Sequence, residues 1–185
     1  MALKFITGNK NKFIEIQSML APLEVEQLNI NLAEIQSLDA GEIIEHKLIE
    51  AQKQGQGEFI VEDTSVYLEC LNNQLPGPFI KWFLESLQPK GIADLALRAG
   101  NTKAYAQTLL GYAKDGDIKF FEGRNDGEIV APIGDKDFGW GPIFKPQGSD
   151  KTYGQMEREE KYSVSMRGIA ARKLKEFLQN GQSHT

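Results

Sequence analysis

The 185-residue sequence contains a single cysteine, Cys70, which excludes a disulfide within the chain and makes a reducing cytoplasm the expected compartment. No stretch approaches the roughly 20 consecutive apolar residues that a membrane-spanning helix needs, so we expect no membrane partner. The N-terminal residues also lack a long apolar segment that ends in a small-residue cleavage site. We therefore expect no secretory signal.

Positive charge is also scarce, because 21 Lys and Arg residues face 26 Asp and Glu residues, a formal net charge of −5. This balance argues against binding to a nucleic-acid polymer, whose affinity for proteins comes largely from phosphate neutralisation. A smaller polyanion could bind only where basic residues cluster locally. With 41% hydrophobic and 25% charged residues, the chain has the composition of a globular protein, and we expect a single domain over residues 1–185.

The hydrophobic pattern predicts strands mixed with helices. Strands are expected over residues 3–7, 24–30, 59–61, 102–113, 118–124 and 128–132, and helices over residues 13–21, 42–54, 79–87, 92–97 and 163–178. Asp115-Gly116-Asp117 and Asn125-Asp126-Gly127 have the residue types of hairpin turns. Residues 138–148 are rich in Gly, Pro and aromatics, which predicts irregular structure. The order favours an α/β fold with a mixed sheet.

A candidate phosphate site lies between the first strand and the first helix. Backbone N–H groups at a helix N-terminus favour an anion, a glycine permits close approach, and lysines add charge. The segment consists of Thr7, Gly8, Asn9, Lys10, Asn11 and Lys12. It is not a Walker loop, which needs Gly-Lys-Ser/Thr after a longer spacing. The alternative is an ordinary turn in which Asn9 caps the helix.

Carboxylates suited to a metal follow the apolar run 59–61. Glu62 and Asp63 are placed at the end of that strand, and Glu34 lies in an earlier loop. Mg²⁺ is usually bound by a few carboxylates together with waters and substrate phosphates. Since a strand presents alternate side chains to opposite faces, Glu62 and Asp63 cannot both serve one site, and we favour Asp63. The alternative is a solvated acidic strand end.

Two aromatic residues, Phe138 and Trp140, lie in the Gly- and Pro-rich segment 138–142. Aromatics in such a loop can stack on a nucleobase, a contact worth about 1–3 kcal/mol in single-strand complexes. The alternative is that they fill the core. Lys161 and Arg167 lie at the start of the last predicted helix, where the alternative is a solvated helix end. The residues alone thus indicate an α/β protein with a candidate phosphate site and a candidate metal site.

The ordered motifs TGNKNK, VEDTS, LPGPFIKWFLE, FGWGPIF and EKYSVSMR go further, because together they resemble the inosine triphosphate pyrophosphatase family, also called Ham1-like. The resemblance runs from Phe5 to about Phe177. It implies an elongated mixed α/β fold, with a long curved sheet forming two lobes around a nucleotide cleft, and a homodimer. It also implies Mg²⁺-dependent hydrolysis of non-canonical purine nucleotides (ITP, dITP, XTP) to the monophosphate and pyrophosphate.

The resemblance assigns roles motif by motif. It implies Mg²⁺ ligation by Glu34 and Asp63, with Asp63 also the catalytic residue that orients or deprotonates the attacking water. It implies phosphate or nucleotide contacts from Thr7, Gly8, Asn9, Lys10, Asn11, Lys12, Lys47, Thr64 and Lys81. It implies base recognition by Phe138, Gly139, Trp140, Gly141, Lys161, Met166 and Arg167. Among these, Lys161 and Arg167 are donors that would suit a 6-oxo purine and would be left unpaired by ATP.

Two positions depart from the family pattern, which usually has Asp where this chain has Gly141 and His where it has Met166. Both lie in base-recognition segments, whereas the phosphate and metal motifs are intact. One alternative is therefore the same chemistry on a different or broader set of nucleoside triphosphates. Another is a non-catalytic nucleotide-binding homologue, which a pyrophosphate assay with Mg²⁺ would separate from an enzyme.

Overall fold

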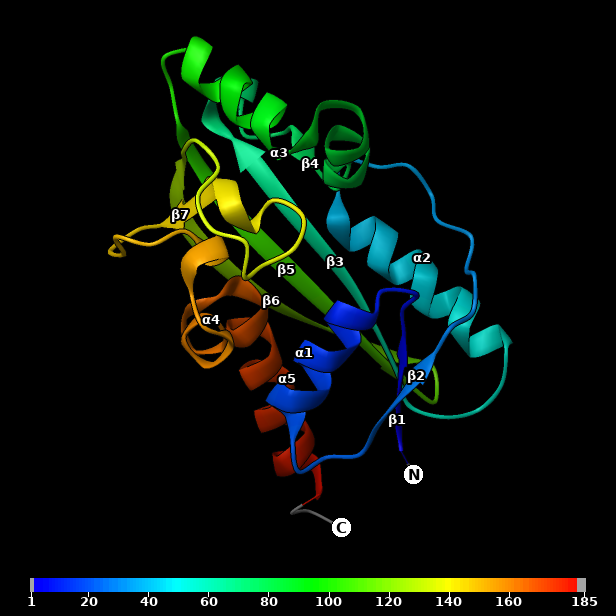
Figure 1. The fold of residues 1–185 in the computed structure, drawn as a ribbon. Coiled ribbons are helices and arrows are strands. Elements are labelled where there is room, and N and C mark those ends of the chain that lie inside the picture. Colours follow the sequence, from blue (N-terminus) through cyan, green and yellow to red (C-terminus); the bar gives the residue numbers. More distant parts are fainter. Residues whose placement is uncertain (1, 183–185) are drawn as a thin grey trace. The chain divides into compact units, whose positions relative to one another are not determined.

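The computed structural model describes residues 2–182, which form a mixed α/β fold (Figure 1). The strands are β1 (Leu3–Ile6), β2 (Val25–Leu28), β3 (Phe59–Leu68), β4 (Pro76–Gly77), β5 (Lys103–Lys114), β6 (Asp117–Ile129) and β7 (Phe144–Pro146). The helices are α1 (Lys10–Leu20), α2 (Ala40–Lys53), α3 (Ile80–Arg98), α4 (Arg158–Val164) and α5 (Met166–Gln182), with short 3-10 turns at Glu69–Leu71, Gly141–Ile143 and Tyr153–Gln155. Within residues 2–182, no helix combines the length and the apolar character needed to cross a membrane.

The sheet is mixed, as the sequence predicts. Its seven strands follow the order β2-β1-β3-β5-β6-β7, with β4 paired to β3. β1 runs parallel to β2 and β3, whereas β4 and β7 run antiparallel to β3 and β6. The predicted hairpin at Asp115 is confirmed, because Asp115 (φ 50°) and Gly116 (φ 92°) join the neighbouring strands β5 and β6 with the left-handed backbone of a tight turn.

The second predicted hairpin is wrong. Asn125-Asp126-Gly127 lies inside β6, which continues without a turn to Ile129. The glycine serves close packing there, because a Cβ on Gly127 would lie 2.4 Å from the carbonyl oxygen of Lys145 on the neighbouring strand. β3 is also longer than predicted and continues to Leu68, so Glu62 and Asp63 lie in the middle of a buried strand instead of at its end.

The helix predictions need smaller corrections. The two helices predicted over 79–87 and 92–97 fall within α3, whose backbone breaks at Gln88 (φ 57°, ψ 167°), immediately before Pro89. The C-terminal helix predicted over 163–178 is divided, because α4 ends at Val164, Ser165 is extended, and α5 begins at Met166. The segment 138–148, predicted to be irregular, contains a 3-10 turn and the short strand β7.

The chain separates into two compact units, and β3, β5 and β6 contribute residues to both. The first unit comprises the chain up to Asp63, Thr108–Gly123, and the chain from Met166 onward. In this unit α1 and α5 cover one face of the sheet around Phe5, Ile60 and Leu174, while α2 covers the other around Ile44 and Val61 (Figure 1). This is a three-layer arrangement with a core on each side of the sheet.

The second unit comprises Thr64–Gln107 and Arg124–Ser165, and it includes α3, α4, β4 and β7. Part of its core is an aromatic cluster in which Trp140, Phe144 and Tyr153 pack with ring centroids 5.4–6.0 Å apart. All three residues are buried, and the last two are fully so. The loop that carries the predicted base-binding residues is thus anchored on this core.

Gly123 marks the closest packing between β6 and the start of α5. A Cβ at this position would lie 1.8 Å from the carbonyl oxygen of Met166 and 2.8 Å from the backbone nitrogen of Ala170. We expect Gly123→Ala to destabilise the fold by about 3 kcal/mol or more, because backbone atoms cannot move aside as a flexible side chain can. Thermal unfolding should show a fall in Tm of about 10 °C. Lys119→Ala, an exposed change on the same strand, should leave Tm nearly unchanged, and equal Tm values for the two variants would contradict this account.

Tyr112 in the first unit donates a hydrogen bond to Glu58 Oε2 (3.0 Å), and Lys114 Nζ lies 2.8 Å from Glu58 Oε1. Burial, followed by the hydrogen bond and charge of Glu58, raises the pKa of Tyr112. Because an unfolded phenol ionises near pH 10, the stabilisation is present below that pH and declines as the pH rises above it. We expect the free energy of unfolding of Tyr112→Phe, measured with urea at pH 9 and pH 11, to fall less than that of the parent. An equal fall would contradict the assignment.

Candidate functional site

The predicted phosphate segment joins β1 to α1, and its first turn is capped by a side chain. Asn9 Oδ1 accepts hydrogen bonds from the backbone N–H groups of Asn11 (2.9 Å) and Lys12 (3.2 Å), while Thr7 Oγ1 accepts from the N–H of Asn9 (3.1 Å). The capping role considered for Asn9 is thus confirmed. Gly8, Asn9, Lys10 and Asn11 are exposed, so the charge of Lys10 and the helix N-terminus face solvent.

A buried charge cluster lies beside this segment in the first unit. Arg167, at the start of α5, donates to both carboxylate oxygens of Glu62 through Nε (2.8 Å) and Nη2 (2.9 Å), and its Nη1 donates to Glu15 of α1. Lys12 Nζ lies 3.0 Å from Glu62 Oε1 and is the outermost member of the cluster. Arg167 therefore contacts carboxylates on two other elements and connects α1, β3 and α5.

This environment fixes the charge state of Arg167. Burial by itself would lower the pKa of the guanidinium, but the charges and hydrogen bonds of Glu62 and Glu15 outweigh it and raise the pKa. The arginine thus stays protonated inside the protein. Its side chain is 2% exposed and each of its nitrogens donates to a carboxylate, so Arg167 belongs to an internal charge network, and its predicted contact with a base stays a prediction.

The strand alternation expected for Glu62 and Asp63 agrees with this cluster. Glu62 points toward Arg167, so the side chain of Asp63 leaves the opposite face of β3. Asp63 is 8% exposed. Glu62 therefore holds cations from the protein itself, and Asp63 is the carboxylate of this pair that remains a candidate for metal and water.

Glu34 and Lys47, two further predicted site residues of the first unit, lie together. Lys47 Nζ is 3.0 Å from Glu34 Oε2, and Glu34 is the more exposed partner. No group of three or more His, Cys, Asp and Glu side chains among residues 2–182 could hold a metal ion. The two carboxylates Glu34 and Asp63 still fit Mg²⁺ chemistry, because this ion is usually held by one or two carboxylates while waters and substrate phosphates complete its coordination.

In the second unit the predicted base-binding loop is partly buried. Trp140 is 8% exposed and belongs to the aromatic cluster, so the alternative that this aromatic fills the core is confirmed for Trp140. Gly139 adopts a left-handed backbone (φ 64°), which turns the chain between Phe138 and Trp140. Of the two aromatics, Phe138 is only partly buried, so it is the one that stays a candidate for stacking on a base.

Lys161 of α4 lies next to Phe138 and to an acidic residue that sequence reasoning missed. Its Nζ is 2.6 Å from Asp137 Oδ1 and 5.1 Å from the centre of the Phe138 ring. The side chains of Lys161 and Asp137 are only 6% and 8% exposed. The signal that could have revealed Asp137 is its position, directly before Phe138 and four residues before Gly141.

The remaining predicted residues fall in different surroundings. Thr64 is buried in β3, and Lys81 at the start of α3 is largely exposed, with its nearest carboxylate, Glu85, 3.9 Å away. Met166 is 2% exposed and, like Arg167, belongs to the first unit, whereas residues 138–141 and Lys161 belong to the second.

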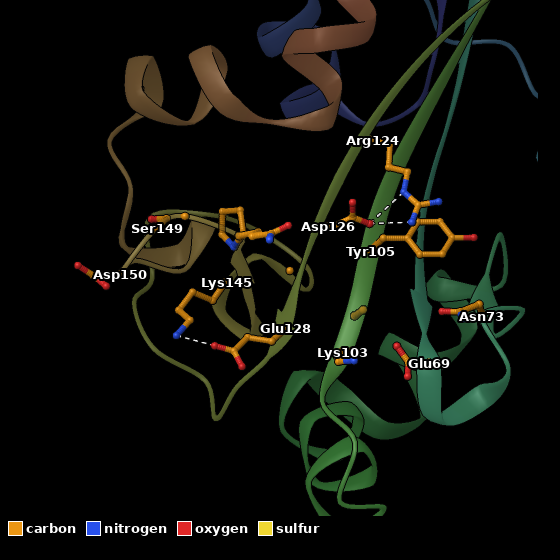
Figure 2. Close-up of a pocket in the computed structure, with 15 residues that line it drawn as sticks. Glu69, Asn73, Lys103, Tyr105, Arg124, Asp126, Glu128, Lys145, Ser149 and Asp150 are labelled. Carbon is orange, nitrogen blue, oxygen red and sulfur yellow. Dashed lines mark hydrogen bonds and ion pairs between the residues drawn. The ribbon is translucent and has the colours of Figure 1, made fainter.

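A large hollow in the second unit contains none of the predicted site residues (Figure 2). Its volume is about 890 Å³, and it lies along β5, β6 and the segment after β7. Arg124 lies 3.7 Å from the centre of the Tyr105 ring and pairs with Asp126 (2.7 Å), while Lys145 pairs with Glu128 (2.6 Å). The lining includes three basic residues, Lys103, Arg124 and Lys145, and four acidic ones, Glu69, Asp126, Glu128 and Asp150, so the hollow has no excess of the positive charge that a triphosphate needs.

The fold and these residues define a mixed α/β protein with lysines and carboxylates suited to phosphate chemistry. The Ham1 family model matches residues 3–177, and the chain therefore belongs to the Ham1 family. It is 37% identical over 182 residues to the inosine triphosphate pyrophosphatase of Schizosaccharomyces pombe, a match that covers 97% of this chain and 96% of the relative.

Solved structures share the fold. The Ham1 protein of Staphylococcus aureus superposes with a TM-score of 0.79 at 21% identity, covering 96% of this chain and 99% of that one. A HAM1 protein of Coxiella burnetii gives 0.80 at 21% identity, with the same coverage. A nucleoside-triphosphatase, dITP/XTP pyrophosphatase, of Mycobacterium abscessus gives 0.72 at 22% identity, covering 94% of this chain and 98% of that one.

Proposed function

We propose that this protein is a nucleoside-triphosphate pyrophosphatase that hydrolyses non-canonical purine nucleotides such as ITP, dITP and XTP. The observation that carries the proposal is the nearly full-length match to an inosine triphosphate pyrophosphatase, at 37% identity. The chain also retains Glu34, Asp63 and the lysines that the family resemblance assigns to metal and phosphate.

The proposed reaction is attack of water on the α-phosphorus. The new bond joins the water oxygen to the α-phosphorus, the α–β anhydride bond breaks, and pyrophosphate leaves. Asp63 orients the water and accepts its proton, a role that typically contributes 10²–10⁴-fold. Mg²⁺, held by Glu34 and Asp63 when bound, would neutralise the charge that develops on the leaving group.

The lysines supply the remaining positive charge. A nucleoside triphosphate carries about four negative charges, which Lys10, Lys12, Lys47 and Lys81 would help to neutralise. Lys10 is exposed at the start of α1, whereas Lys12 and Lys47 are held by Glu62 and Glu34 at 3.0 Å. These ion pairs keep two cations in place in a chain whose net charge is −5.

Base selection is assigned to the second unit. Phe138 stacks on the base without regard to its identity, and Lys161 donates a hydrogen bond to an oxygen at position 6 of a purine. Adenine carries an amino group at that position. In ATP this hydrogen-bond donor would face the ammonium of Lys161, which is also a donor, and no hydrogen bond could form. Sites built on such hydrogen bonds can reject the wrong analogue by about 10⁴-fold or more.

Pyrophosphate release measured with Mg²⁺ across ITP, XTP, dITP, ATP, GTP and the pyrimidine triphosphates tests the function. We expect kcat/KM for ITP and XTP to exceed that for ATP strongly. A displaced or broad preference would favour the alternative of the same chemistry on other nucleotides. No release from any substrate would favour a non-catalytic nucleotide-binding protein.

We also propose a homodimer and a cytoplasmic location. The first rests on the family resemblance and the second on the single cysteine, Cys70. Light scattering after size exclusion tests the dimer, whose expected mass is twice the 20.7 kDa of the chain. A monomeric mass at micromolar concentration would contradict it.

A further inference from the structure

Position 141 carries no carboxylate in this chain, yet a carboxylate occupies the space beside it. A Cβ at Gly141 would lie 2.1 Å from Asp137 Oδ2 and 2.6 Å from Asp137 Cγ. No side chain at position 141 can share this space with Asp137 in its present position. Gly141 and Asp137 are therefore coupled, since the glycine is what allows the carboxylate to lie there.

The carboxylate of Asp137 is used within the second unit. Its Oδ1 accepts a hydrogen bond from Lys161 Nζ at 2.6 Å, and both side chains are buried. A buried ammonium is stable only when it is paired, so Asp137 determines where the charge of Lys161 lies. That position is 5.1 Å from the centre of the Phe138 ring, close enough for a cation–π contact with the ring proposed to stack on the base.

We infer that Asp137 is the positioning residue for base recognition in this protein, with its carboxylate in the space that the absence of a side chain at Gly141 leaves open. This inference rests on the proposed function, in which Lys161 donates to the 6-oxo group. Asp137 acts through Lys161: it holds the donor beside Phe138 and so favours a 6-oxo purine over adenine.

The test compares base selectivity with and without turnover. The ratio of IMP to AMP affinity, from calorimetry, reports recognition even where no triphosphate is hydrolysed, and the ratio of kcat/KM for ITP and ATP reports it during catalysis. We expect Asp137→Asn to lower the ratio about tenfold, because a neutral amide oxygen replaces the charged acceptor that holds Lys161. Asp135→Asn, which alters an exposed carboxylate in the same loop, should leave the ratio unchanged.

Relocation of the carboxylate separates positioning from simple support of the fold. Gly141→Asp alone should unfold at a lower temperature, because its Cβ meets Asp137. The double variant Asp137→Gly with Gly141→Asp should recover both the melting temperature and most of the IMP preference. Circular dichroism and thermal unfolding establish that each variant is folded before its ratio is measured.

Different results would contradict the role of Asp137 and the proposed enzymatic function. A parent that hydrolyses ITP, together with an Asp137→Asn protein whose IMP to AMP ratio stays unchanged, would overturn the inference alone. A parent with no preference between IMP and AMP would also overturn it. A parent that prefers IMP but releases no pyrophosphate would contradict the proposed enzyme, and the effect of Asp137→Asn on the affinity ratio would still decide the inference.

Discussion

Asp63→Asn is expected to reduce kcat for ITP by about 10²–10⁴-fold while nucleotide binding changes much less. Asparagine has nearly the size of aspartate, so the buried position in β3 stays filled, but it cannot accept the proton of the attacking water. It is also a weaker ligand for Mg²⁺, since it brings no negative charge. Both effects act on the chemical step.

Asp117→Asn is the matched control, because it makes the same chemical change at an exposed position at the start of β6. Its kcat should equal that of the parent. Pyrophosphate release measured at saturating ITP and Mg²⁺, together with ITP affinity from calorimetry, separates turnover from binding. Near-normal turnover by Asp63→Asn would remove Asp63 from the role of base, and a large loss of affinity without loss of kcat would reassign it to nucleotide binding.

Sequence patterns located most elements of the fold because local periodicity and long-range packing agree there. The amphipathic helices α1 and α2 and the hairpin turn at Asp115 were predicted with small errors in their ends. The errors came where packing outweighs local chemistry. Asn125-Asp126-Gly127 has the residue types of a turn, but pairing of β6 with β7 keeps it extended, and only the absence of a side chain at Gly127 permits that approach.

The sequence predicted which acidic and basic residues belong to the candidate site, but not which of them form ion pairs with one another. Sequence alone placed Lys12 and Arg167 in different motifs, and their common contact with Glu62 follows from the packing of α1 and α5 on the same face of the sheet. Asp137 was missed for a related reason. Its partner, Lys161, lies 24 residues away along the chain, and no local pattern marks such a pair.

Removal of the guanidinium in Arg167→Ala is expected to destabilise the protein by about 3–5 kcal/mol, because it takes from the buried carboxylates of Glu15 and Glu62 the cation that contacts them both. For a chain of this size the fall in Tm is about 10 °C. Arg98→Ala, at an exposed position at the end of α3, is the matched control and should change Tm little. Combining Arg167→Met with Glu15→Gln and Glu62→Gln should recover much of the loss, since no buried carboxylate is left without the guanidinium and the remaining charge, on Lys12, is partly exposed to solvent.

The same variant separates two roles for Arg167. If its side chain bound the base, as the sequence pattern suggested, folded Arg167→Ala would lose its preference for ITP over ATP. Because the guanidinium already donates hydrogen bonds to Glu15 and Glu62, we expect the ratio of kcat/KM for ITP and ATP to equal that of the parent. The assay is run at a temperature below the lowered Tm, where the variant is folded. A lost preference at unchanged stability would restore Arg167 to base recognition. A retained preference with reduced stability would assign selectivity to Lys161 and Asp137, and would assign Arg167 to holding α1, β3 and α5 together.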